Sequence, residues 1–299
     1  MIRLLAIGDA GEDTILRRQN VDVMRELAPR LDAVLVLGDN FYKHGVVSDT
    51  DPRWERDMER VYPHGLPCLA ILGNHDYLGD PEAQVRKTNL SIGTSVQWIM
   101  PKRYYMCTLD REGVTVDVWM LDTFSLSPSK SWKNSFNSDM SPDQWDHLDR
   151  IGRHDKTRQL DWLRSSLAES TARWKIVCGH YPVLSDGGHG DNPELQQCLL
   201  PLFQQYGVDA YLCGHDHSLQ HISFQGTQFL ISGTGSRYHA YRPRRSLVPS
   251  SATGVALLEF TATHMTMSFV HHAMNTIYAK TVPYTESTAR PSLPPAFGR

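Results

Sequence analysis

Five short apolar runs in the sequence each end in a glycine that is followed by polar side chains able to bind a metal ion. The runs are RLLAIGDAG, AVLVLGDN, CLAILGNHD, WKIVCGHY and AYLCGHDH. The polar residues at their ends are Asp9; Asp39 and Tyr42; Asn74, His75 and Asp76; His180; His215 and His217. These are oxygen and imidazole donors without a thiolate, so they exclude a cysteine-type zinc site and suit hard or borderline metals.

The number of these donors indicates two metal ions. A mononuclear catalytic site uses about three protein ligands, whereas seven or eight converging donors fit two ions. Two ions bridged by an oxygen ligand are a known arrangement for phosphoryl hydrolysis. A single histidine at a strand end is more often a hydrogen-bonded structural residue. Five such segments in one chain favour the metal hypothesis, because all of them require the same geometry.

The elements that must position these donors are predicted by the pattern around them. Each run is short, continuous and rich in branched residues, as expected of a strand buried on both faces. Helix-like stretches lie between several of the runs, at 14–31, 51–62, 155–170 and 193–207. Alternating strands and helices predict an α/β fold with functional groups at the carboxyl ends of the strands. Six more strand-like segments predict a second sheet packed on the first: 103–110, 114–123, 228–235, 255–263, 264–272 and 277–283.

Composition and length predict one globular domain. The chain has 299 residues, 40% of them hydrophobic, and a net charge of −3. This charge gives no general attraction to nucleic acid or to an anionic membrane, and no apolar run reaches the roughly 18 residues of a membrane helix. The five cysteines are scattered without a CxxC pair, so we expect no disulfide framework. We expect a single domain at 1–283 with a long polar insertion loop at 125–155, and a disordered tail at 284–299.

Two further expectations concern location and surface. The start MIRLLAIGDAG is not typical of a signal peptide, because its apolar part is short and no cleavage-type segment follows. The sequence alone therefore predicts a cytoplasmic protein, and we expect a monomer. The short basic cluster RPRR at 242–245 predicts a solvated loop rather than a binding patch.

The order of the motifs GDxG, GDNxY, GNHD, GHYPV and GHDH resembles that of the calcineurin-like metallophosphoesterases. The segments GDNFY, GNHDYLG, CGHYPV and YLCGHDHSLQ are similar, nearly residue for residue, to the small, mammalian-type (tartrate-resistant) purple acid phosphatases. This resemblance covers about residues 3–283. It implies two stacked mixed β-sheets flanked by helices, a four-layer α/β/β/α sandwich. Proteins of this family are mostly lysosomal or secreted, whereas this sequence, without a visible signal peptide, predicts a cytoplasmic protein.

The resemblance also implies a ligand set for each ion. The ferric ion would be bound by Asp9, Asp39, Tyr42 and His217. A second, divalent ion (Fe2+, Zn2+ or Mn2+) would be bound by Asp39, Asn74, His180 and His215, so that Asp39 bridges the two. In this family the tyrosine binds as a phenolate and gives the purple colour. A phenol with a pKa near 10 must lose its proton to become a ligand, and a highly charged ion makes that loss easy.

Three further residues receive roles other than metal binding, His75 and His189 by resemblance and Asp76 from the usual behaviour of carboxylates at metal sites. His75 faces the substrate and stabilises or protonates the leaving oxygen, work that suits an imidazole near neutral or mildly acidic pH. His189, in SDGGHG, matches the second active-site histidine of the family. Asp76 is expected to orient a histidine from behind the ligands, as carboxylates often do at metal sites.

The implied function is hydrolysis of phosphate monoesters, either small molecules or phosphoproteins. A metal-bound hydroxide would attack the phosphorus in line, since metal binding lowers the pKa of water toward neutrality. Two alternatives remain open: a manganese- or zinc-dependent phosphodiesterase without ferric iron, and a non-catalytic scaffold that binds phosphoproteins. The complete ligand set argues against the scaffold.

Overall fold

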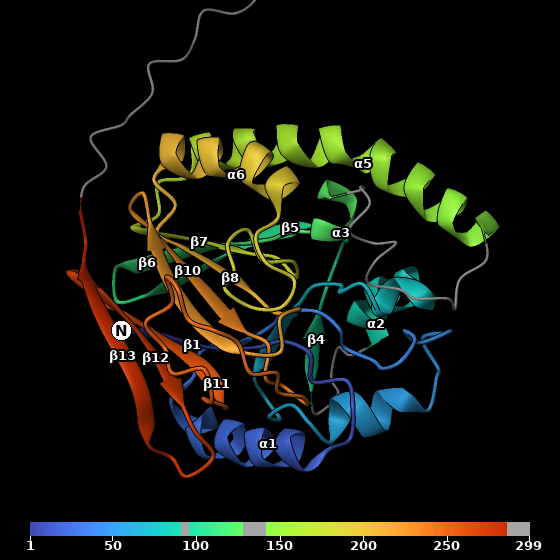
Figure 1. The fold of residues 1–299 in the computed structure, drawn as a ribbon, viewed down its shortest axis with the longest axis horizontal. Coiled ribbons are helices and arrows are strands. Elements are labelled where there is room, and N and C mark those ends of the chain that lie inside the picture. Colours follow the sequence, from blue (N-terminus) through green and yellow to red (C-terminus); the bar gives the residue numbers. More distant parts are fainter. Residues whose placement is uncertain (91–95, 128–141, 286–299) are drawn as a thin grey trace, which may run out of the picture.

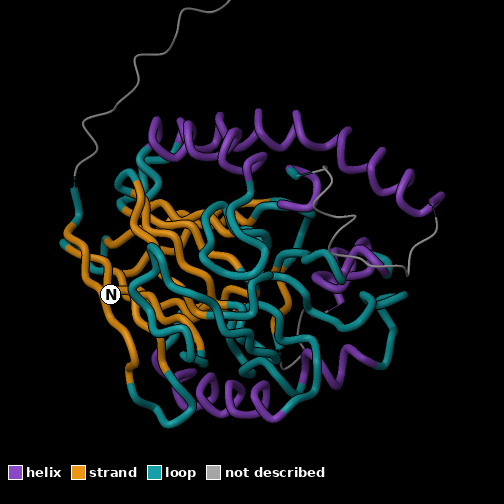
Figure 2. The backbone as a smooth tube through the Cα atoms, in the orientation of Figure 1, coloured by secondary structure: helices purple, strands orange, loops and turns teal. Residues whose placement is uncertain are grey.

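A computed structural model describes residues 1–90, 96–127 and 142–285 of the chain (Figure 1). Two mixed β-sheets lie face to face in the middle of the molecule. Helices α5 and α6 cover the outside of one layer and α1 lies on the opposite side, so that the strands occupy the space between helices (Figure 2). The predicted arrangement of two stacked sheets flanked by helices is therefore confirmed.

The first sheet has seven strands in the order β13-β12-β11-β1-β2-β3-β4. Their bounds are β1 Ile2–Ile7, β2 Ala33–Val36, β3 Pro67–Ala70, β4 Gln97–Ile99, β11 Val255–Phe260, β12 His264–Val270 and β13 Thr276–Pro283. Strands β1 to β4 run parallel to one another. Strand β11 pairs antiparallel with β1, and β12 and β13 continue this antiparallel edge.

The second sheet has six strands in the order β5-β6-β7-β8-β10-β9. Their bounds are β5 Tyr105–Arg111, β6 Val114–Met120, β7 Trp174–Cys178, β8 Ala210–Cys213, β9 Leu219–Phe224 and β10 Thr227–Ser232. Strands β6, β7, β8 and β10 are parallel, while β5 and β9 are antiparallel edge strands.

The division of strands between the sheets differs from the prediction. The sequence suggested that the six additional segments would form the second sheet, but β11, β12 and β13 extend the first one. They do so because β1 has a free edge whose backbone groups need partners, and β11 supplies them. The five strands with polar ends are likewise shared, with β1, β2 and β3 in one sheet and β7 and β8 in the other.

Helices connect the parallel strands. The longer ones are α1 Ile15–Leu27, α2 Pro81–Leu90, α5 Pro142–Glu169 and α6 Pro193–Tyr206, and α3 is the single turn Thr123–Leu126. Helix α6 confirms its sequence signals, since the Asn192 side chain accepts hydrogen bonds from the first turn and Gly207 ends the helix at φ 64°. The predicted helix at 51–62 is reduced to the short π-helical segment Glu55–Glu59.

The expectation of a loop over 125–155 is wrong for its second half. Helix α5 begins at Pro142, and proline at a first helical position favours such a start. The predicted helix at 155–170 is thus the end of a longer one, whose polar first half was mistaken for a loop. Residues 128–141 of the expected loop lie outside the described residues.

The remaining sequence expectations concern the tail, the cysteines and the membrane. Residues 286–299 of the expected tail lie outside the described residues, but Tyr284 packs against Trp174 with ring centroids 5.3 Å apart. All five cysteines are described and are free thiols, as predicted. Among the described helices, none has the length and apolar character needed to cross a bilayer.

Candidate metal centre

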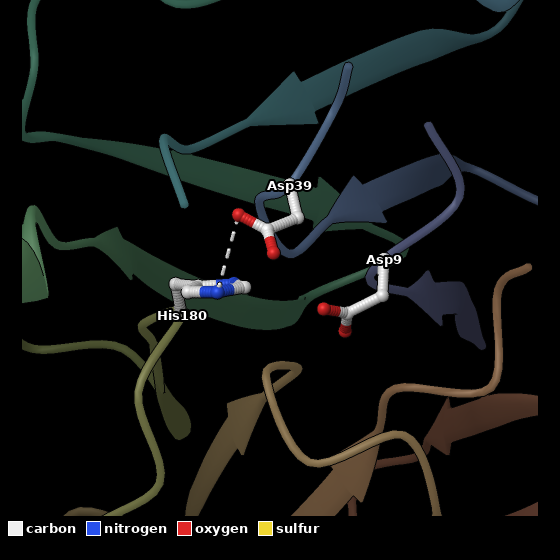
Figure 3. A group of neighbouring side chains, drawn as sticks. All are labelled: Asp9, Asp39 and His180. Atoms are coloured by element: carbon white, nitrogen blue, oxygen red, sulfur yellow. Dashed lines mark ion pairs between the residues drawn. The ribbon is translucent and has the colours of Figure 1, made fainter. Parts of the chain in front are cut away.

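The polar ends of β1, β2, β3, β7 and β8 meet in one place. Figure 3 shows the side chains of Asp9, Asp39 and His180 pointing toward one another from three of these strand ends, and one ligand atom of each lies within 4.8 Å of the others. The strands are buried on both faces; all four residues of β2, for example, are buried. The core therefore holds these strand ends in fixed positions.

The backbone at these ends is strained. Asp9, Asp39 and His215 have φ values of 61°, 53° and 68°, in a region that costs a residue with a side chain about 1–3 kcal/mol. Such strain persists where the surroundings over-determine it, and here it turns each side chain toward the centre. The preceding glycines give the room: a Cβ on Gly73 would collide with the Asp39 carboxylate, and one on Gly214 with the Asp9 carboxylate.

Three of the predicted ligands gather around a fourth, the Tyr42 phenol. Its hydroxyl donates to Asp39 Oδ2 at 2.8 Å and to Asp9 Oδ1 at 3.2 Å. His217 Nε2 is 3.3 Å from the phenol oxygen and 3.5 Å from Asp9 Oδ1. Two carboxylates, a phenol and an imidazole thus face a common space, which is a donor set for a hard, highly charged cation.

The other predicted ligands gather around His180. The Nδ1 of His180 donates to the Leu37 carbonyl at 2.8 Å, so Nε2 is the ring nitrogen that faces the other predicted ligands. That nitrogen lies 3.0 Å from Asn74 Oδ1 and 3.5 Å from Asp39 Oδ1. An imidazole nitrogen, an amide oxygen and a carboxylate oxygen thus face one another, which is a donor set that suits a divalent metal ion. The residues present therefore fit a metal ion at this position as well.

Asp39 stands between the two groups. Its Oδ2 faces Tyr42 and its Oδ1 faces His180, so one carboxylate is within reach of both sets of donors. Burial alone would raise its pKa, but the nearby His180 and His75 and the His75 backbone N–H outweigh burial and lower it. The side chain is therefore an anion at neutral pH, as a bridging ligand must be.

His215 completes the arrangement beside His180. Its ring is buried, 5.1 Å from the His180 ring and 4.6 Å from the Tyr181 ring between centroids. Burial, and then the neighbouring imidazoles, lower the pKa of His215 well below its ordinary value. The ring is thus neutral and able to bind a metal. Its backbone N–H donates to Asp9 Oδ2 at 2.8 Å, which links the ends of β8 and β1.

The two predicted catalytic histidines lie at the mouth of this cluster. His75 has 27% of its side chain exposed, and its ring centroid is 4.5 Å from that of Tyr42. Its Nδ1 is 2.6 Å from the Lys43 carbonyl. His189 is exposed and its ring lies 4.1 Å from that of His215 between centroids. The structure therefore places one histidine beside each group of candidate ligands.

The expected role of Asp76 is wrong. Its carboxylate accepts hydrogen bonds from the backbone N–H groups of Gly73 (2.8 Å) and Asn40 (3.1 Å) and from the Gln84 amide (2.8 Å). None of these partners is a histidine. Asp76 instead ties the segment after β3 to the segment after β2, because a buried carboxylate is most stable where several N–H groups converge on it.

Sequence reasoning did not identify the residues that follow β10 in the chain and lie beside the proposed ligands. Arg237 lies with its guanidinium carbon 5.7 Å from the centre of the Tyr42 ring and pairs with Glu12. The His239 ring is 4.8 Å from that of His217. A signal was present, since QFLISGTG is a sixth apolar run that ends in glycine, and β10 lies beside β8.

Comparisons with known proteins agree with this geometry. The model of the calcineurin-like phosphoesterase family matches residues 2–219. The tartrate-resistant acid phosphatase type 5 of Oryctolagus cuniculus is 31% identical over 94% of this chain and 91% of its own length. Purple acid phosphatase 17 of Arabidopsis thaliana is 37% identical over 69% of this chain and 59% of its own length.

Solved structures share the fold at lower identity. GAP50, the anchor in the inner membrane complex of Plasmodium, superposes with a TM-score of 0.80 at 24% identity, over 96% of this chain and 90% of its own. Purple acid phosphatase PPD1 from Lupinus luteus seeds gives 0.65 at 15% identity, over 94% of this chain and 53% of its own. The family model and the relatives that match along most of the sequence show that this chain belongs to the calcineurin-like phosphoesterases, and among them to the tartrate-resistant (purple) acid phosphatases.

Proposed function

We propose that this chain, a phosphoric monoester hydrolase by family, cleaves phosphate monoesters at an Fe(III)–M(II) centre, where M is iron, zinc or manganese. The ligands proposed for the ferric ion are Asp9, Asp39, Tyr42 and His217. Those proposed for the divalent ion are Asp39, Asn74, His180 and His215. The substrates would be small-molecule phosphate monoesters or phosphoproteins.

The observation that carries the proposal is the environment of the Tyr42 hydroxyl. Burial, and then the charges of Asp39 and Asp9, raise the pKa of this phenol well above its ordinary value. By themselves these neighbours keep the proton on the oxygen. A trivalent cation at contact distance reverses the balance, because it attracts the phenolate and offsets the charge of both carboxylates. A phenol held against two carboxylates at this position therefore supports a trivalent ion such as ferric iron.

The remaining steps follow from the chain's own side chains. When bound, two such ions supply positive charge to the phosphate and acidify water enough to provide a nucleophile near neutral pH. His75 gives one ring nitrogen to the Lys43 carbonyl, so Nε2 is the nitrogen that carries a proton to the leaving oxygen. His189, next to His215, is placed to bind the phosphoryl oxygens from the other side.

The likeness to an anchor protein does not favour the scaffold alternative, because at 24% identity it is a likeness of fold. The full set of ligand types at the five strand ends supports catalysis instead. Paired assays on a phosphate monoester and a phosphate diester separate the proposed activity from that of a phosphodiesterase.

Metal analysis and an absorption spectrum of the purified protein test the ferric assignment. We expect iron, a second ion, and a visible charge-transfer band that Tyr42→Phe removes. The matched control is Tyr181→Phe, which removes another buried hydroxyl beside His215 and should keep the band. A colourless wild-type protein that holds two ions and turns over fully would contradict ferric iron while leaving a metal-dependent phosphatase.

A further inference from the structure

The loop that carries His189 is fastened to a distant part of the chain. This loop, residues 185–191, is called the His189 loop below. Its Asp186 side chain is fully buried and accepts three backbone hydrogen bonds at 2.6–2.9 Å. These bonds offset the free-energy cost of removing the carboxylate from water. The donors are three successive residues of the segment after β10: Arg244, Arg245 and Ser246.

One side chain of that segment closes both ends of the His189 loop. The Arg245 guanidinium donates to Asp186 Oδ1 at 3.0 Å and to the Ser185 carbonyl at 2.8 Å at the start of the loop. At the end of the loop it forms a two-pronged pair with Asp191, at 2.6 and 3.0 Å. The planar fork of arginine is suited to this geometry, because it presents several donors at fixed angles.

The middle of the His189 loop rests on Asp216, which lies between the proposed ligands His215 and His217. Asp216 Oδ1 accepts the backbone N–H of His189 at 3.1 Å, and its other oxygen accepts the Ser185 hydroxyl. A Cβ on Gly187 would lie 2.6 Å from the Asp216 carboxyl, so the loop approaches as closely as glycine allows. These contacts place the His189 ring against His215.

We propose that Arg245 is a positioning residue for the proposed phosphatase reaction, holding the His189 loop closed on Asp216 so that His189 faces the metal centre. The inference rests on the proposed function, because it assumes that His189 acts on the substrate. Three of the seven loop residues are glycines, which leave the backbone with many conformations when it is unfastened. The sequence predicted only a solvated loop for the basic cluster at 242–245, but Arg245 of this cluster has a proposed role at the site.

A double-mutant cycle tests this role. Arg245→Gln should lower kcat on an alkyl phosphate by roughly tenfold, since displacing a catalytic group by about 1 Å can cost ~10²-fold. Metal content and the absorption spectrum should stay unchanged, because Arg245 contacts no proposed ligand. In a His189→Ala background Arg245→Gln should have almost no further effect, since the residue that it positions is gone. Arg245→Lys, which keeps the charge but loses the fork, should fall between wild type and Arg245→Gln.

Controls keep the test decisive. Arg242→Gln removes an exposed arginine of the same segment and should leave kcat at the wild-type value. If Arg245→Gln does not fold, Asp191→Asn removes the charge that pairs with Arg245 and keeps an oxygen for the Ser185 N–H. It should show a smaller loss with the same dependence on His189. Equal loss with and without His189, or wild-type kcat for Arg245→Gln, would overturn the inference. Wild-type kcat for His189→Ala would also overturn it without touching the metal proposal, which metal analysis and the spectrum decide separately.

Discussion

The parallel strand pairs β1–β2 and β7–β8 carry aspartates at their amino ends as well as polar side chains at their carboxyl ends, but only the carboxyl ends form a candidate site. At the amino ends, Asp32 precedes β2 and accepts the backbone N–H of Arg3 at 2.8 Å. Asp209 precedes β8 and accepts the backbone N–H of Lys175, also at 2.8 Å. Each carboxylate there has a neighbouring donor and bonds the start of the adjacent strand.

At the carboxyl ends the partners are different. The Asp9 carboxylate lies beside His217 and the Asp39 carboxylate lies beside His180. The Asn74 amide oxygen lies beside the same His180 nitrogen. Oxygen and nitrogen atoms from several strand ends thus face one space, as a metal site requires. The comparison shows that a buried aspartate does not by itself indicate a functional site. What distinguishes the candidate metal centre is that ligand atoms of several side chains from different strand ends converge on one space.

The largest effect expected from this difference is that of Asp39→Asn. Asp39 faces both groups of ligands, so its amide variant should lose both ions and at least about 10³-fold in kcat/KM, since metal assistance provides several kcal/mol. Asn74→Ala is the matched comparison and should deplete mainly the divalent ion. Metal content per chain checks both variants. Retention of two ions by Asp39→Asn would mean that Asp39 does not bridge.

The positions of the proposed ligands were predictable because each follows directly from its own strand. A buried strand that ends in glycine and a polar residue fixes that residue at the carboxyl edge of the sheet, whichever sheet the strand joins. The convergence of these side chains therefore does not depend on how the strands are divided between the two sheets. Asp76 shows where such local reasoning fails. It is next to His75 in the sequence, but its hydrogen bonds go to Gly73, Asn40 and Gln84.

The next effect concerns the mouth of the centre. His75→Ala should keep both ions and the colour, and lose ~10²-fold in turnover of an alkyl phosphate, because a basic alkoxide needs a proton to leave. Turnover of para-nitrophenyl phosphate should fall less, since its phenolate leaves without that help. Both rates are measured on one sample together with its metal content. Loss of metal in proportion to activity would show that His75 is structural or a ligand.

The fastening of the His189 loop could not be predicted from the sequence. The side chain that closes it, Arg245, lies 54 positions from its partner Asp191 and in a different connection between strands. Such a contact depends on how β7, β8 and β10 are ordered in the second sheet, and no local pattern encodes that order. The basic cluster was correctly expected on the surface, where all four of its residues are exposed. Its contacts with the acidic loop appear only when the fold is assembled.

The smallest effect on activity is expected at the amino ends of the strands, where Asp209→Asn should leave turnover unchanged. The variant should instead alter how stability depends on pH. Burial raises the pKa of Asp209 to about 7, against the opposing influence of the Lys175 backbone N–H and the Lys175 charge. In the unfolded chain an aspartate has a pKa of about 3.9. The folded protein therefore holds a proton on Asp209 between about pH 4 and pH 7 that the unfolded chain has released.

The sign follows from this difference in proton binding. A folded state that binds the extra proton loses stability as pH rises, so the contribution of Asp209 is fully present below about pH 4 and is gone above about pH 7. Asparagine is neutral throughout and keeps an oxygen for the Lys175 N–H, so it removes this dependence. Relative to wild type, Asp209→Asn should gain up to a few kcal/mol in free energy of unfolding between pH 4 and pH 8, at about 1.4 kcal/mol per unit of pKa difference. Denaturant unfolding of both proteins across this range measures the difference in free energy of unfolding, in which the titration of the metal centre cancels.

A constant difference between the two proteins would mean that Asp209 is ionised in the folded protein at every pH in this range. A loss of kcat in Asp209→Asn with metal retained would mean that the amino ends of these strands also affect catalysis.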